Sequence, residues 1–167
     1  MVDHMTDIPV FSSDYPSEYA TLYNTLASSC DHYSRSGDNA VWVGRGLNLM
    51  MATIELMAER CLLADFETLK ETMTCDTLCR AAMDYRLSIG LRRRIQDVFS
   101  SIPGVPADLR DVVNEGGRKL KSYKSVRREF KALTLIVGAL YNLSFPSPGR
   151  RRTRQTDEMA APKPILP

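Results

Sequence analysis

The sequence predicts an all-α fold, chiefly because it contains two long amphipathic segments. In residues 40–63 and again in residues 119–143, apolar side chains recur at alternating steps of three and four. This period places them on one face of a helix. No convincing run of alternating polar and apolar residues suggests a strand. We therefore expect a compact bundle of about six helices, with residues 40–63 forming the central one.

Each of the two segments has an apolar stripe that should face the core, and the first also has a defined polar face. The first segment should turn one polar face to solvent and an apolar stripe inward. The polar face is traced by Arg45, Asn48, Ala52, Glu55 and Glu59, and the apolar stripe by Val43, Leu47, Met50, Ile54, Met57 and Cys61. The apolar stripe of the second segment consists of Leu120, Tyr123, Val126, Phe130, Leu133, Val137 and Leu140.

Shorter helices are expected on both sides of the central one. Pro16 suits the first turn of a helix that reaches about Cys30. Asp65 and Ser88 are the residue types that cap helix N-termini. They predict one helix through Phe66, Leu69 and Met73, and another with Leu91, Ile95, Val98 and Ile102 inward. A proline lacks the backbone donor, so Pro103-Gly104 should end the latter helix.

Two more helical pieces complete the expected bundle. Residues 76–85 should form a helix with Leu78, Ala82 and Tyr85 inward. A short piece is expected over residues 106–114, before Gly116-Gly117.

The chain length of 167 residues suits a single domain. We expect a flexible N-terminal arm over residues 1–15, in which residues 1–5 (MVDHM) read as a cloning remnant. Residues 16–143 form the helical domain, and residues 144–167 form a disordered tail that contains Pro and Arg. Because no secretory signal or bilayer-length apolar run is visible, a soluble, cytoplasmic protein is expected.

Charge is distributed unevenly along the chain. Residues 1–76 hold 4 bases and 12 acids, a balance of −8, whereas residues 77–167 hold 18 bases and 8 acids, a balance of +10. Such a division is typical of a protein that offers one face to an anionic partner. The alternative is that the two halves attract each other within the fold.

The sequence predicts no catalytic, cofactor-binding or metal-binding residue. It lacks the glycine-rich phosphate loop, the dinucleotide-binding motif and the zinc-protease motif. Its cysteines do not have zinc-site spacing, and only two histidines accompany them. We expect reduced, mostly buried thiols at Cys30, Cys61, Cys75 and Cys79. The acid pair Glu55 and Glu59 lies on the face predicted to be solvated, which argues against general acid–base chemistry.

The strongest functional signal is basic. Residues 118–131 contain seven bases and one acid. The residues predicted to contact nucleic acid or another anionic partner are Lys121, Lys124, Arg127, Arg128 and Lys131. All but Arg127 share one helix face, which suits a surface that follows phosphates. The alternative is a solvated face that pairs with the acidic half. A second cluster, Arg92-Arg93-Arg94, is expected at the surface.

Methionines suggest a second candidate site. Met50 and Met57 share the inner face of the central helix, and methionine-rich surfaces adapt to protein partners. A protein-binding groove at these residues is one interpretation. Methionine as a filler of the core is the other.

Several segments resemble the all-α domain of type IV coupling proteins, the hexameric ATPases that feed DNA or protein into conjugation and secretion machines. Residues 38–49 (DNAVWVGRGLNL) are similar to the helix start of that domain, with Trp42 and Arg45 as its aromatic-x-x-Arg pair. Residues 101–105 (SIPGV) are similar to a break later in that domain. The resemblance covers about residues 10–143, and its motifs are short.

The resemblance implies a function without local chemistry. Such a domain receives a secretion substrate, an accessory protein or DNA. ATP hydrolysis occurs in a motor domain whose motifs this chain lacks. The parent would be a membrane-associated ATPase oligomer, with this domain on the cytoplasmic face of the inner membrane and not inserted into it. The alternatives are a free-standing helical adaptor or chaperone that binds a protein through the groove near Met50 and Met57, and a small DNA-binding regulator.

Overall fold

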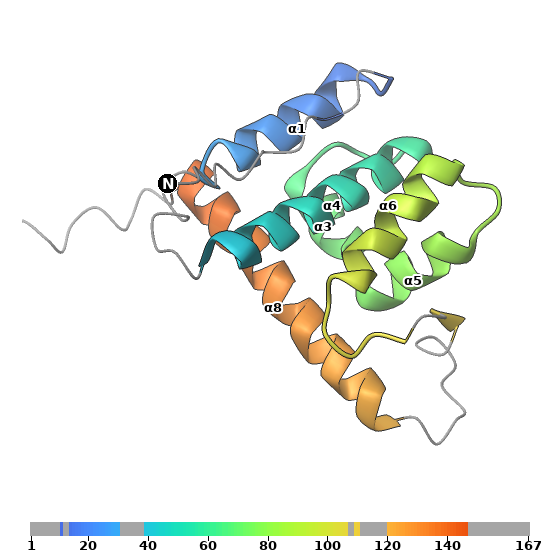
Figure 1. Cartoon of the computed structure of the whole chain (residues 1–167). Helices are drawn as coiled ribbons and strands as arrows, with labels where there is room; N and C mark the ends of the chain where they lie inside the picture. Colours follow the sequence, from blue (N-terminus) through green and yellow to red (C-terminus); the bar gives the residue numbers. More distant parts are fainter. Residues whose placement is uncertain (1–10, 12–13, 31–38, 107–108, 111–119, 147–167) are drawn as a thin grey trace, which may run out of the picture.

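The computed structural model describes residues 11, 14–30, 39–106, 109–110 and 120–146 (Figure 1). These residues form helices and connecting turns without a strand, so the predicted all-α class is confirmed. The helices are α1 (Ser17–Ala27), α3 (Asn39–Glu59), α4 (Phe66–Thr72), α5 (Cys75–Met83), α6 (Ile89–Ser100) and α8 (Leu120–Ser144). The predicted arm, the tail and the helical piece at 106–114 lie largely outside the described residues.

Helix α3 is the centre of the bundle, as predicted, and it contacts α1, α4, α6 and α8 (Figure 1). Every residue from 49 to 57 is buried. The prediction of one solvent-facing polar side is therefore wrong here, because Ala52 is fully buried and Glu55 is only 3% exposed. Neighbouring helices on all sides have replaced the solvent that the periodic pattern suggested.

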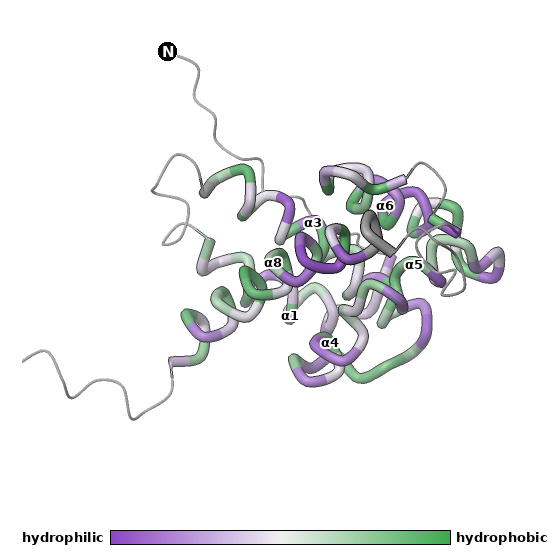
Figure 2. The backbone as a smooth tube through the Cα atoms, turned by 90° about the horizontal axis from the view of Figure 1, so that it is seen from below, coloured by the Kyte–Doolittle hydropathy of each residue, from purple (hydrophilic) through white to green (hydrophobic). Residues whose placement is uncertain are grey.

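Helix α8 crosses α3 and buries the apolar stripe that the sequence predicts. Val126, Phe130, Leu133, Val137 and Leu140 are all buried in the common core. Hydrophobic and hydrophilic residues are interspersed along its course, as an amphipathic helix requires (Figure 2). The side chains of Leu120 and Tyr123 lie outside the described part of the chain.

The caps of the shorter helices follow the sequence closely. Asp65 accepts a hydrogen bond from the Thr68 amide at 2.8 Å, and Ser88 Oγ accepts one from the Leu91 amide at 3.2 Å. Both predicted caps are confirmed. The cap of α5 is Thr74, whose side chain accepts from the Thr77 amide. Helix α5 ends at Met83, so Tyr85 leaves the helix face and is 83% exposed, contrary to the prediction that it points inward.

Helix α3 ends four residues before the predicted boundary, in a Schellman turn. The Leu62 amide donates to the Met57 carbonyl at 2.9 Å, and the Cys61 amide donates to the Ala58 carbonyl at 3.1 Å. Cys61 adopts the left-handed conformation with φ of 52°. Because the chain turns here, Cys61 is exposed and does not continue the predicted apolar stripe. All four cysteines are free, and the other three are buried.

The crossing of α3 and α8 is close at one glycine. A Cβ added to Gly46 would lie 2.9 Å from Ile136 Cγ2, whereas one added to Gly44 meets nothing within 4 Å. Both glycines lie inside α3, which agrees with the expectation that they do not cradle a phosphate. Gly46 is therefore required for packing, and Gly44 is not.

This pair of glycines gives a matched test of the crossing. We expect Gly46→Ala to lower the free energy of unfolding by about 1–3 kcal/mol, because the branched Ile136 side chain has little room to move. Gly44→Ala should raise it by about 0.5–1 kcal/mol through helix propensity. Urea unfolding measures both. Equal effects of the two substitutions would contradict the close crossing.

The left-handed residue at the end of α3 gives a second test. Cys61→Gly should raise the free energy of unfolding by about 0.5–1 kcal/mol, since glycine adopts positive φ without steric cost. Arg60→Gly, one residue earlier and without positive φ, should lower it. A destabilised Cys61→Gly variant in urea unfolding would show that the thiol contributes more than its backbone conformation costs.

Candidate functional site

The basic face of α8, defined here as Lys124, Arg128 and Lys131, is exposed. The three cations lie on the side of the helix that turns away from the buried stripe. The Arg128 side chain is 78% exposed, and its Nη2 donates a hydrogen bond to Oε1 of its neighbour Glu129 at 3.1 Å. Lys121 continues the same face, but its side chain lies outside the described residues. The predicted grouping of Lys124, Arg128 and Lys131 on one solvent-facing side is therefore observed.

Arg127 behaves differently from the other predicted contact residues. Its Nη2 donates to both carboxylate oxygens of Asp76, at 2.8 and 2.6 Å. This interaction links α8 to the first turn of α5 and joins the basic half of the sequence to the acidic half. The alternative interpretation of the charge division, attraction within the fold, thus applies to Arg127, whereas the basic face of α8 remains open to solvent.

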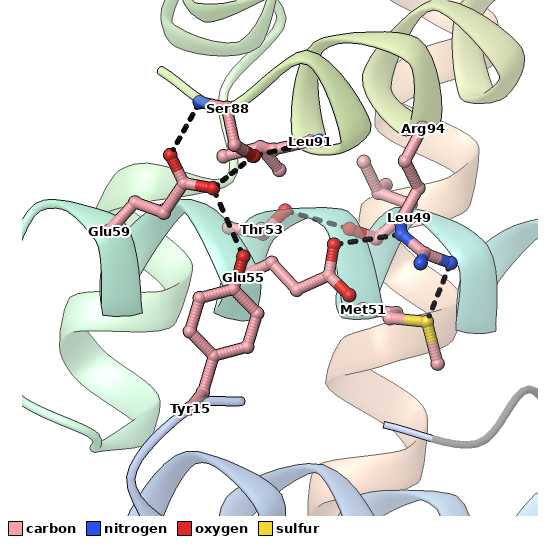
Figure 3. A network of polar contacts seen from close by, with 9 residues as sticks. All are labelled: Tyr15, Leu49, Met51, Thr53, Glu55, Glu59, Ser88, Leu91 and Arg94. Atoms are coloured by element: carbon pink, nitrogen blue, oxygen red, sulfur yellow. Dashed lines mark hydrogen bonds and ion pairs between the residues drawn. The ribbon is translucent and has the colours of Figure 1, made fainter. Parts of the chain in front are cut away.

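The second link between the halves is an ion pair in the core (Figure 3). Glu55 on α3 lies 2.7 Å from Nε of Arg94 on α6, measured from its Oε2. The Glu55 side chain is 4% exposed, whereas that of Arg94 is 41% exposed. Arg94 Nη1 also contacts Met51 Sδ at 3.1 Å. The prediction that Glu55 lies on a solvated face is therefore wrong, and Arg94 is only partly a surface residue.

Burial sets the protonation behaviour of this pair. Removal from water raises the pKa of Glu55 above its ordinary value, and the positive charge of Arg94 opposes the rise. The carboxylate thus carries a desolvation cost that its partner only partly offsets. Such a pair fixes the orientation of α6 against α3 more than it adds net stability.

Glu59 receives hydrogen bonds from two other segments (Figure 3). Tyr15 Oη donates to its Oε1 at 3.0 Å, and the Ser88 amide donates to its Oε2 at 2.9 Å. Ser88 Oγ also donates to Oε1. Burial, followed by the bond to Glu59, raises the pKa of Tyr15, so the phenol keeps its proton and remains a donor. Glu59 therefore connects the segment before α1 with the N-terminus of α6, and it is not a free acid on a solvated face.

The predicted methionine groove is absent at the positions proposed for it. Met50 and Met57 are both 0% exposed and belong to the core. Their side chains fill space between α3 and its neighbours, which is the other role considered for them. The protein-binding groove at Met50 and Met57 is therefore wrong for this conformation.

Cys75 and Cys79 form a buried thiol pair one turn apart on α5. A hydrogen bond from Cys79 lowers the pKa of Cys75, and the same bond together with burial raises the pKa of Cys79. In the part of the chain that the structure describes, no three cysteine, histidine or acidic side chains gather as a metal site would require.

Comparisons with protein-family models, curated proteins and solved structures gave no match for this chain. Within the described ranges, no helix has both the length and the apolar character needed to cross a membrane.

The buried ion pair predicts a pH dependence of stability. Because the pKa of Glu55 is raised in the folded state, the stability contributed by its protonated form is fully present below the unfolded-state value of about 4.3. That stability is lost as the pH rises through the higher folded-state pKa. Glu55→Gln does not titrate, so the wild type should lose free energy of unfolding relative to this variant across that window.

Urea unfolding of both proteins from about pH 4 to about pH 8 measures this difference. Arg94→Gln provides the control, because loss of the cation should steepen the wild-type trend by raising the pKa of Glu55 further. A wild type that gains stability relative to Glu55→Gln as pH rises would show that attraction to Arg94 exceeds the desolvation cost.

Proposed function

We propose that this chain is a helical binding domain that receives an anionic partner on the basic face of α8. The observation that carries the proposal is the contrast within one helix. Arg127 is held by Asp76, while Lys124, Arg128 and Lys131 face solvent together. Positions 124, 128 and 131 span about 10 Å along a helix axis. Each strand of a DNA duplex presents about three phosphates over that length.

We further propose that the partner machine is a type IV secretion or conjugation system, in which this chain acts as the substrate- or accessory-protein-recognition domain of a coupling protein. The resemblance supports this, and two local features agree with it. Trp42 and Arg45, the aromatic-x-x-Arg pair, are in contact in α3, with the guanidinium 5.2 Å from the ring centroid. The SIPGV segment follows the end of α6 at Ser100. The presence of motor motifs elsewhere in the same natural reading frame would be the direct genetic test.

Charge reversal of the basic face tests the proposed contact with nucleic acid. The triple variant Lys124→Glu, Arg128→Glu, Lys131→Glu should lose binding to a fluorescent DNA duplex, measured by anisotropy. In the wild type the logarithm of the binding constant should fall with the logarithm of salt concentration with a slope of about 0.9 per phosphate contacted. Helical circular dichroism should be unchanged, since all three residues are exposed.

A charge-matched control separates a site from general attraction. The triple variant Arg80→Glu, Arg86→Glu, Arg93→Glu changes the net charge by the same amount on α5, α6 and the turn between them, and these residues are also exposed. It should retain most of the binding and the same salt dependence. Equal losses in the two triple variants would refute a nucleic-acid site on α8.

A further inference from the structure

A groove opens on the part of the molecule formed by α5, α6, residues 105–106 and residues 109–110. Its volume is about 1050 Å³. Arg92, Gln96 and Ser100 follow one another at four-residue steps along its α6 wall. The last turn of α5 and the segment after Pro103 supply an apolar lining of Ala82, Met83, Val105, Pro106 and Leu109. Among the described residues that line it, none belongs to α8, so the groove is distinct from the basic face.

The apolar part of the groove includes Met83, which is more exposed than the methionines of the core. Met50, Met51, Met57 and Met73 are buried, whereas Met83 is 37% exposed. A flexible thioether at the rim of an apolar surface adapts to different side chains. A methionine that can contact a protein partner is therefore found at Met83, and not at Met50 or Met57, where the sequence pattern predicted it.

The charged part of the groove is Arg92. Its Nε is buried, and it has no hydrogen-bond partner among the described residues. Arg94 and Arg127 are each paired with a carboxylate, at Glu55 and Asp76 respectively. A partly desolvated guanidinium without an acid partner favours an incoming carboxylate, because charge-assisted hydrogen bonds to arginine are strong and geometrically specific.

The size and shape of the groove favour a polypeptide over a small molecule. Pockets for small ligands have volumes of about 300–1,000 Å³ and enclose most of the ligand surface. The volume of this groove lies slightly above that range. Exposed side chains, among them Gln96 and Asp97 of α6, form its edge. Arg92, Arg110 and Asp97 are the charged side chains among the described residues that line it.

We propose that this groove binds an acidic peptide segment of a partner protein. An apolar side chain of the peptide packs against Met83 and Leu109, and an adjacent carboxylate pairs with Arg92. The combination of an apolar surface with one partly desolvated cation selects for both features at once, whereas a polyanion requires only the cation. The inference stands independently of the proposed contact between α8 and nucleic acid.

The test uses the whole chain and a short fluorescent peptide in which Glu and Leu alternate. We expect saturable binding by anisotropy, and a loss of about tenfold or more in affinity for Arg92→Gln and for Met83→Glu. The matched control is Arg93→Gln, which removes a neighbouring exposed charge on α6 outside the groove and should leave the affinity unchanged. Circular dichroism verifies that each variant is folded.

Two companion peptides separate the contributions of charge and apolar contact. Replacement of every Glu by Lys, or of every Leu by Gln, should abolish saturable binding. Methyl NMR of labelled methionine should show a shifted Met83 resonance on addition of the acidic peptide, with Met50 and Met57 unmoved. This signal reports binding even where a variant proves unstable.

Several results would overturn the proposal. These are the absence of saturable binding, equal binding of the basic peptide, or full affinity in Arg92→Gln. Displacement of the peptide by an oligonucleotide would assign the groove to nucleic acid, and concentration-dependent dimerisation lost in Met83→Glu would assign it to a second copy of the chain. Failure of the α8 charge-reversal test would leave these outcomes unaffected, because Lys124, Arg128 and Lys131 do not line the groove.

Discussion

Burial of residues 49–57 of α3 on every side is the constraint on which the rest of this structure depends. A helix with solvent on one face tolerates any polar residue there, but residues 49–57 have no such face. The polar residues within that stretch must find partners inside the protein. Thr53 bonds to the Leu49 carbonyl of its own helix, and Glu55 pairs with Arg94 of α6. The orientation of α6 is thereby tied to the chemistry of α3.

That orientation in turn creates the groove. Arg92 and Arg94 are two positions apart on α6, so their side chains leave the helix in nearly opposite directions. Because Arg94 is paired with Glu55, Arg92 points to the other side of α6, where α5 and residues 105–106 and 109–110 line the groove. The bonds of Ser88 to Glu59 hold the N-terminus of α6 to the last turn of α3 as well. Two fixed points on one helix leave little freedom for the groove wall to move.

The sequence was sufficient to predict where the helices lie in the chain, but not which side chains of other helices surround each of their residues. Periodicity and capping residues identified α3, α6 and α8, because these signals are local. The environment of Glu55 was missed, since a polar stripe looks the same whether it faces water or one arginine of another helix. A usable signal existed, because Glu55 and Thr53 are the only polar residues in the nine-residue stretch 49–57. Arg127 and Arg128 are likewise adjacent in sequence, and only tertiary structure shows that one is paired with Asp76.

The two proposed surfaces use different physical forces, which makes their partners separable. Three exposed lysine and arginine side chains on α8 would attract phosphates through long-range electrostatic interactions. This attraction weakens steeply as the salt concentration rises, because salt ions screen the charges. In the proposed peptide site, burial of apolar surface at Met83 and Leu109 is largely insensitive to salt, and the ion pair at Arg92 is the part of the contact that salt weakens. Higher salt is therefore expected to weaken the proposed nucleic-acid contact more than the proposed peptide contact. If both proposals hold, the domain would keep a protein partner at a salt concentration that releases a polyanion.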